Sequence, residues 1–125
     1  MPHFLAVLPV VLALQATDVL VPGKPAPAFT VDSFVAGQEF KALEPGTVHV
    51  VEFWATWCPP CVASIPHMTK LQKDNPDVRV VGVAGFERGP DPAANRKRVQ
   101  EFVAAKGDAV GYAIAFAGEG SMGNG

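Results

Sequence analysis

The sequence predicts an α/β domain built around one βαβ unit, in which a helix joins two parallel strands. Three observations predict it. Residues 47–54 and 78–84 are apolar runs rich in β-branched residues, and residues 59–75 between them carry apolar side chains at helical spacing. A helix between two such runs returns the chain to the same edge of the sheet, so the strands run parallel with a right-handed crossover.

The first strand, residues 47–54, follows the turn Glu44-Pro45-Gly46. Its near-continuous apolarity predicts burial on both faces, as in a parallel sheet. Side-chain alternation puts Glu52 on the same face as Val50 and Trp54, and puts Phe53 on the opposite face with Val51. The Glu52 carboxylate is therefore expected to lie among apolar groups.

The helix over residues 59–75 places four side chains on one face at spacings of four and three: Cys61, Ile65, Met68 and Leu71. Pro66 interrupts this segment and is expected to kink it, because a mid-helix proline removes a hydrogen bond and crowds the preceding turn. Asn75-Pro76-Asp77 ends the helix.

The remaining elements flank this unit. Residues 28–35 and 39–43 are predicted to form an N-terminal β-hairpin that covers a sheet edge. A second helix begins at Pro92 after the N-cap Asp91 and stops near Gly107, and residues 112–116 form a third short strand. The loop over residues 85–90 leaves the sheet at the same edge as the cysteines, so Phe86 and Glu87 are expected to line a substrate surface.

The chain divides into three parts. Residues 1–16 contain an apolar run from Phe4 to Leu14 that predicts a secretory signal peptide, with an uncleaved membrane anchor as the alternative. Residues 22–117 form the domain, after a proline-rich linker over residues 21–27, and residues 118–125 form a tail expected to be disordered. A signal would place the domain in the periplasm or otherwise outside the cytoplasm, where disulfides persist.

Composition narrows the function classes. The 125 residues carry a net charge of −2, 49% hydrophobic and 18% charged residues, which fits one small soluble domain with no basic bias toward nucleic acid. Both cysteines belong to one Cys-x-x-Cys pair, so a single chain cannot form a four-cysteine zinc site, and Val62 excludes a CxxCH haem attachment. No metal site and no cofactor is expected beyond the redox-active disulfide itself.

The Cys58-Pro59-Pro60-Cys61 stretch carries the chemistry. Cys58 at the start of the helix is the candidate nucleophile, because the helix dipole and unpaired backbone N–H groups favour a thiolate there. Cys61, one turn further, would resolve the mixed disulfide. Pro59 and Pro60 have no N–H to donate and carry no charge, so we expect a weakly acidic thiol and a reducing couple.

The ten residues Glu-Phe-Trp-Ala-Thr-Trp-Cys-Pro-Pro-Cys at 52–61, with Pro66 five residues further, resemble the thioredoxin superfamily and specifically its secreted TlpA-like and ResA-like thiol-disulfide reductases. Pro-Ala-Pro-Ala-Phe at 25–29 resembles the entry to that family's added N-terminal hairpin. The resemblance covers residues 22–118. It implies a thioredoxin-like fold with an N-terminal β-hairpin, and exchange of disulfides with disulfide-containing proteins and a thiol electron donor.

The resemblance also implies roles for individual residues. The acidic residue of the strand before the cysteines serves as a proton relay in this family, and that position is Glu52 here; the alternative is a strand-end carboxylate that reaches solvent. Trp57 would cap the active surface. Trp54 would pack beneath it, a placement equally typical of ordinary core, and Pro66 is structural.

The sequence departs from the family after the third strand. No proline follows Pro92, and 125 − 116 = 9 residues follow Phe116, too few for the family's cis-proline loop, final β-hairpin and C-terminal helix. The fold is therefore expected to be incomplete, with the strand over residues 47–54 as an open edge. This departure supports an alternative function, a non-enzymatic fragment or binding module that holds a metal between chains through the CxxC.

Overall fold

The predicted βαβ unit is present in the computed structural model, which describes residues 20–118. Strand β2 (His49–Trp54) leads into helix α1 (Pro59–Asp74), which returns the chain to strand β3 (Arg79–Ala84). Helix α2 (Pro92–Lys106), a short 3₁₀ turn and strand β4 (Ala113–Phe116) follow, and strand β1 (Ser33–Ala36) precedes the unit. The predicted signal or anchor, and residues 119–125 of the predicted tail, lie outside the described residues.

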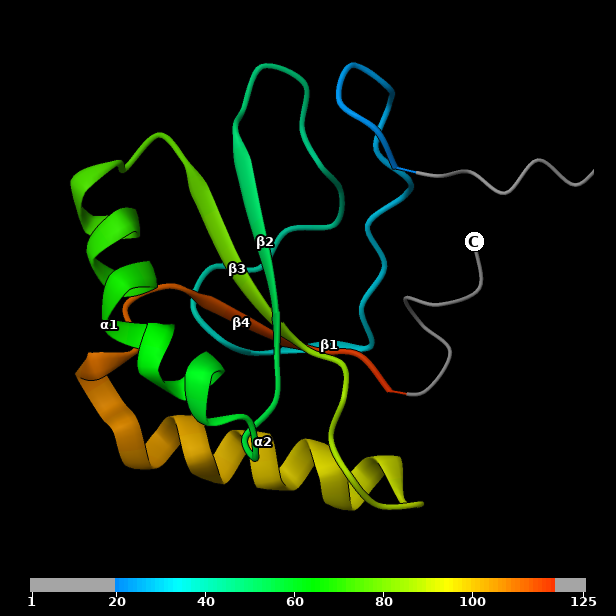
Figure 1. Ribbon diagram of the computed structural model, residues 1–125, viewed down its shortest axis with the longest axis vertical. Helices are drawn as coiled ribbons and strands as arrows, with labels where there is room; N and C mark the ends of the chain where they lie inside the picture. The colour runs from blue at the N-terminus through cyan, green and yellow to red at the C-terminus, as the bar shows by residue number, and fades with distance from the viewer. Residues whose placement is uncertain (1–19, 119–125) are drawn as a thin grey trace, which may run out of the picture.

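The sheet has four strands in the order β1-β4-β3-β2 (Figure 1). Strands β2, β3 and β4 are parallel, and β1 pairs antiparallel with β4. In the β2–β3 register Glu52 lies opposite Gly82, and Trp54 lies opposite Ala84. The α/β thioredoxin-like core predicted from the sequence is confirmed.

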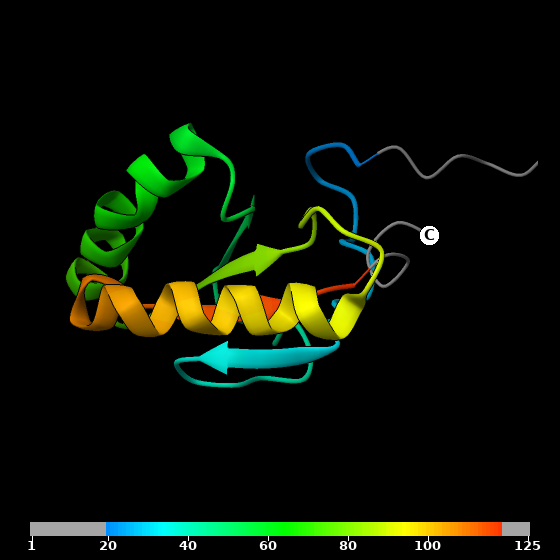
Figure 2. The ribbon, with the colours of Figure 1, turned by 90° about the horizontal axis from the view of Figure 1, so that it is seen from below.

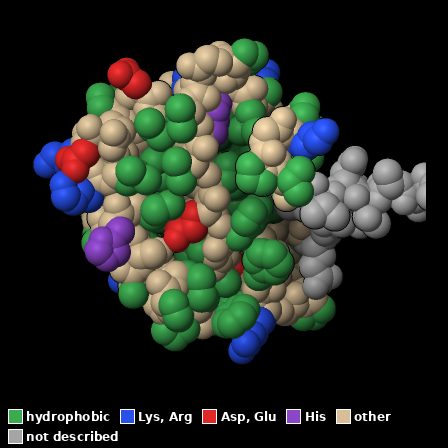
Figure 3. Space-filling view, turned by 45° about the horizontal axis from the view of Figure 1, so that its top comes forward, with side chains coloured by type: hydrophobic (Ala, Val, Ile, Leu, Met, Phe, Trp, Pro, Cys, Tyr) green, Lys and Arg blue, Asp and Glu red, His purple; other side chains and the backbone are tan. Residues whose placement is uncertain are grey.

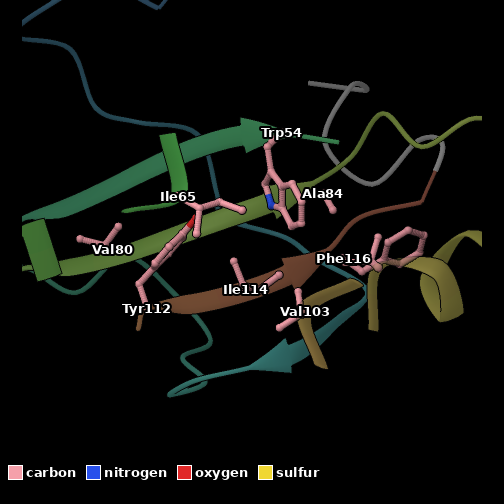
Figure 4. Packing of buried hydrophobic residues seen from close by; sticks show 9 residues of the cluster. Trp54, Ile65, Val80, Ala84, Val103, Tyr112, Ile114 and Phe116 are labelled. Atoms are coloured by element: carbon pink, nitrogen blue, oxygen red, sulfur yellow. The ribbon is translucent and has the colours of Figure 1, made fainter. Parts of the chain in front are cut away.

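The two faces of the sheet are covered differently. Helices α1 and α2 both pack on one face, whose core joins Trp54, Val80, Ala84 and Ile114 of the strands to Ile65 of α1 and to Val99 and Val103 of α2 (Figure 4). Irregular chain covers the opposite face, where Phe29 and Phe40 pack against Val81, Val83 and Ala115. Figure 2 shows α2 running alongside the sheet, with β1 below it in this view.

The predicted N-terminal hairpin, in which residues 28–35 pair with residues 39–43, does not form. Ser33–Ala36 does form a strand, but its partner is β4, and residues 39–43 form no strand. Two tertiary contacts explain this outcome. The edge of β4 offers β1 a backbone partner, and Phe40 is buried against Phe29, with ring centroids 5.0 Å apart, so the second segment packs on the sheet face. Strand β1 alone covers a sheet edge, that of β4, which is the role the sequence predicted for the hairpin.

Strand β2 is the edge of the sheet, and no other strand among the described residues pairs with its outer side. The predicted open edge is therefore confirmed. The prediction that β2 is buried on both faces is wrong: Phe53 is 49% exposed, because nothing in the described chain covers that part of the face. An exposed apolar edge strand is a site where another strand can add.

Helix α1 continues unbroken through Pro66 to Asp74, and the expected kink at this proline stays a prediction. The four side chains predicted to share a face all contribute to the core under α1: Cys61, Ile65, Met68 and Leu71. None of the helices described in residues 20–118 is long and apolar enough to cross a membrane.

Candidate active site

The two cysteines lie where the carboxyl end of β2 turns into α1. Cys58 is the N-cap of the helix, and its Sγ is bonded to that of Cys61, with the two Cα atoms 5.3 Å apart. The backbone N–H of Cys58 donates to the Ala55 carbonyl at 3.1 Å, and its own carbonyl accepts from Val62 at 3.0 Å. The turn and the first helical hydrogen bond therefore fix Cys58 from both sides.

Pro59 and Pro60 occupy the first two helical positions. A helix leaves its first N–H groups without partners inside the helix, and these groups normally stabilise an anion at its N-terminus. Here the two prolines supply none, and the Cys58 N–H is already bonded. The Cys61 N–H is therefore the one remaining donor of the first turn. Because so few donors can stabilise a Cys58 thiolate, we expect the Cys58 thiol to be weakly acidic.

The loop after β3 lies beside the disulfide, as the carboxyl-edge argument predicted. The Trp57 indole Nε1–H donates to the Phe86 carbonyl at 2.7 Å, and the Arg88 guanidinium lies 3.7 Å from the centre of the Trp57 ring. Trp57 is 44% exposed and Phe86 is 62% exposed. The Phe86 ring also meets Phe53 edge to face, with centroids 6.3 Å apart.

Hydrophobic side chains are spread over much of one face of the molecule, with lysine and arginine side chains toward its margin (Figure 3). The exposed residues Phe53, Trp57 and Phe86 join the ends of β2 and β3 into one apolar surface, which we call the aromatic surface. Sequence reasoning missed Phe53, because its pattern predicted a buried strand.

The Glu87 side chain turns inward. Its Oε1 accepts from the backbone N–H of Thr56 at 2.6 Å, and its Oε2 accepts from the Thr56 hydroxyl at 2.8 Å. Arg98 of α2 approaches Oε2 at 3.5 Å, and the Glu87 side chain is only 1% exposed. The structure thus joins Glu87 to the turn before Cys58, whereas Phe86 points to the surface.

Glu52 lies under α1, on the sheet face that alternation predicted. The Ser64 hydroxyl lies 2.5 Å from Glu52 Oε1 and 2.7 Å from the Cys61 carbonyl oxygen. A hydroxyl donates one hydrogen and accepts others. When Glu52 is ionised Ser64 donates to it; when Glu52 is protonated it donates to Ser64, which then donates to Cys61. The Ser64 hydroxyl thus links the Glu52 carboxyl to the first turn of α1.

The second Glu52 oxygen, Oε2, is buried and has no hydrogen-bond partner among the described residues. The same is true of Trp54 Nε1 and the Tyr112 hydroxyl. A Cβ at Gly82 would lie 3.0 Å from Trp54 Nε1 and 3.1 Å from Tyr112 Cε2, so glycine makes room for both rings. The Oε2 atom of Glu52 is thus buried, while the residue as a whole is partly exposed.

Comparison with known proteins identifies the family. The Redoxin family model matches residues 21–121. The chain belongs to the Redoxin family. The matched range contains the CxxC, the β2–α1 turn and the four-stranded sheet.

Two curated relatives share parts of this Redoxin sequence. Thiol:disulfide interchange protein HelX of Rhodobacter capsulatus is 32% identical over 81 residues, covering 63% of this chain and 44% of HelX. Mitochondrial thioredoxin-3 of Saccharomyces cerevisiae is 56% identical over 44 residues, covering 35% of this chain and 34% of the relative. The chain thus spans less than half the length of each.

A solved structure, the N-terminal domain of PilB from Neisseria gonorrhoeae, superposes with a TM-score of 0.47 at 15% identity, covering 63% of this chain and 52% of that one.

In the described part of this Redoxin chain no group of three or more histidine, cysteine or acidic side chains is arranged to hold a metal ion.

Tyr112, just before β4, is a further member of the Glu52 environment that sequence reasoning missed. It is 4% exposed, and its ring lies on the same side of the sheet as Trp54 (Figure 4). Burial raises the pKa of the Tyr112 hydroxyl well above its ordinary value, and the nearby Glu52 charge adds to this effect. The neutral hydroxyl is thereby favoured in the folded protein.

We expect alkaline pH to destabilise the domain through Tyr112. An unfolded tyrosine ionises near pH 10, so the contribution of the neutral hydroxyl is present below about pH 10 and is lost as the pH rises above it. Tyr112→Phe should flatten the fall in the free energy of unfolding above pH 10. Urea unfolding at a series of pH values measures this, and Tyr112 is the only tyrosine in the chain.

At neutral pH the same variant should be as stable as the wild type, or more stable by up to about 1 kcal/mol, because it removes a buried hydroxyl without a described partner. If the free energy of unfolding falls equally steeply above pH 10 in both proteins, Tyr112 is not the cause of the alkaline destabilisation.

Proposed function

We propose that this chain is a thiol-disulfide oxidoreductase that reduces disulfides of partner proteins. The observation that carries the proposal is the Cys58–Cys61 disulfide at the start of α1, at the ligand-binding edge of a parallel sheet. The Redoxin match and the name of the relative HelX, a thiol:disulfide interchange protein, support the same chemistry.

The reaction follows from the positions of the two sulfurs. In the dithiol form, the Cys58 thiolate attacks one sulfur of a substrate disulfide, forms a mixed disulfide and releases the other substrate sulfur as a thiolate. The Cys61 thiolate then attacks Cys58 Sγ, which frees the second substrate thiol and closes the Cys58–Cys61 disulfide. Two electrons pass to the substrate, and an external dithiol must return two electrons to the protein.

Glu52 is assigned the proton transfer at Cys61. Cys61 must lose a proton before it attacks, and Ser64 links Glu52 to the same helical turn through its contacts with Glu52 Oε1 and the Cys61 carbonyl. A carboxyl held in this position can take up the proton and give it back during reoxidation. The assignment rests on the family resemblance and on this geometry together.

The aromatic surface is assigned to substrate docking. Phe53, Trp57 and Phe86 are exposed beside the disulfide, and an exposed apolar group of this kind typically binds a protein or peptide. Trp54, in contrast, is buried in the core with its ring 5.6 Å from Phe102 and supports the site from beneath. Pro66 lies within α1 and is exposed, so its part is confined to the helix itself.

An extracytoplasmic, periplasmic location belongs to the same proposal. Its support is the apolar run over residues 4–14, typical of a secretory signal or anchor, together with a chemistry suited to compartments where disulfides form. The electron donor would then be a thiol protein of that compartment.

The test is reduction of insulin disulfides by the purified protein with dithiothreitol as electron source. We expect turnover well above the dithiothreitol background, and the same rate with and without a chelator, because the chemistry needs no metal. Cys58→Ser should return the rate to background. A wild-type rate equal to background would refute the proposal.

A second function is favoured by one observation, the unpaired outer side of β2. A chain with this open edge could act as a binding module that holds a metal between two copies through Cys58 and Cys61. Two cysteines per chain supply four ligands in a dimer, the number a structural zinc site takes. Binding of zinc by the reduced protein, with absent insulin reduction, would support this function over the first.

A further inference from the structure

The buried Glu87 carboxylate connects three elements around the redox site. It receives two hydrogen bonds from Thr56 in the β2–α1 turn, it belongs to the loop after β3, and it faces Arg98 of α2. A buried carboxylate with both oxygens bonded to one residue holds that residue in a fixed orientation. Thr56 lies two residues before Cys58, at most about 7 Å along the chain.

The neighbouring contacts strengthen the same connection. Arg98 Nη1 also donates to the Arg88 carbonyl at 3.0 Å and to Asn95 Oδ1 at 3.1 Å, so the guanidinium is held on the loop. Arg88 covers the Trp57 ring, and Trp57 donates to Phe86. The loop after β3 is therefore fastened to the turn before Cys58 at both Thr56 and Trp57.

Charge is the second consequence of this geometry. Glu87 places a negative charge in a nearly solvent-free position next to the turn, and Arg98, whose side chain is 48% exposed, offsets part of it. A negative charge near a thiolate disfavours the thiolate. Because Pro59 and Pro60 withhold backbone donors, little else in the first helical turn opposes this effect.

We propose that Glu87 is a positioning residue that sets the reactivity of Cys58: its carboxylate holds Thr56 and the turn, and its charge makes the Cys58 thiol less acidic and the couple more reducing. This proposal builds on the proposed oxidoreductase function. It replaces substrate contact as the role of Glu87, because a side chain that is 1% exposed and bonded to Thr56 is not available to a substrate.

The test follows the rate of alkylation of reduced Cys58 by iodoacetamide as a function of pH, in a Cys61→Ser background so that one thiol reacts. Glu87→Gln keeps the side-chain shape and removes the charge. We expect its alkylation profile to shift to lower pH, with about threefold to tenfold faster alkylation at neutral pH. Its dithiol–disulfide couple, measured with both cysteines present against glutathione, should become more oxidising.

Two further variants separate charge from structure. Arg98→Met removes the counter-charge, so its profile should shift in the opposite direction, to higher pH. Thr56→Val removes the hydroxyl bond to Glu87 but leaves the charge and the Thr56 N–H bond in place, so its profile should move less than that of Glu87→Gln.

The outcomes distinguish this proposal from the function itself. If Glu87→Gln folds and its profile superposes on that of the parent, the proposal is overturned, whatever the insulin assay shows. If Glu87→Gln fails to fold, Arg98→Met still decides, because a profile that does not move to higher pH also overturns it. The alkylation measurement needs no substrate protein, so failure of insulin reduction does not affect it.

Discussion

Cys61→Ser will turn the protein from a catalyst into a covalent trap for its substrates. Cys58 remains able to attack a substrate disulfide and form a mixed disulfide. The serine hydroxyl cannot attack Cys58 Sγ to release the substrate thiol, so the mixed disulfide persists. Turnover of insulin should fall by on the order of a thousandfold or more, as for other enzymes that lose a member of a covalent mechanism. Non-reducing electrophoresis should show a covalent adduct of the protein with its substrate, and reduction by dithiothreitol should remove it.

Cys58→Ser is the matched control, because it makes the same change at the other sulfur. It should abolish turnover equally but form no adduct, since Cys61 lies one turn further along α1 and is not the attacking group. The structure gives this asymmetry a basis: Cys58 is the N-cap, next to the exposed Trp57, and Cys61 contributes to the core under the helix. An adduct through Cys61 in the Cys58→Ser variant would reverse the assignment of the two roles.

The elements of the fold were predictable where local pattern decides them. Alternation in residues 47–54 correctly put Glu52 and Trp54 on the face covered by α1. Helical spacing correctly put Cys61 and Ile65 toward that face, and the position of the CxxC followed from the strand-to-helix turn. These features depend on residues close together in the sequence.

The errors arose where distant segments compete. The predicted hairpin failed because residues 33–36 could pair with either of two partners, and β4, about 80 residues away, offered the better one. Phe53 was predicted buried because a single strand cannot reveal what covers it. The inward turn of Glu87 depends on Thr56, 31 residues earlier, and on Arg98 of another helix, and no spacing rule connects them.

One missed partner did have a signal in the sequence. Ser64 lies three residues after Cys61, so helical geometry puts it on the side of α1 that faces the sheet. Alternation had already put Glu52 on the facing side of β2. A polar residue on each of two facing apolar surfaces is expected to pair, because buried polar groups seek hydrogen-bond partners.

Glu52→Gln should slow insulin reduction at neutral pH by about a hundredfold, the lower end of the effect of a positioned proton-transfer group. Glutamine keeps the side-chain shape, and its carbonyl oxygen can still accept from Ser64. It cannot take up the Cys61 proton. Alkylation of Cys58 should remain largely intact, because attack by Cys58 does not require that proton transfer. The measurement pairs insulin turnover with the iodoacetamide rate on the same preparation.

A matched control makes this result specific to position. Glu44→Gln makes the same chemical change in a carboxylate whose side chain is 50% exposed and whose partner, Arg79, lies at the far end of the sheet from the cysteines. It should leave turnover unchanged, since an exposed ion pair contributes little. Ser64→Ala should fall between the two, because it keeps the Glu52 carboxyl and removes the hydroxyl that links it to the turn of Cys61. Unchanged turnover in Glu52→Gln would refute the relay, because no other described carboxyl contacts Ser64.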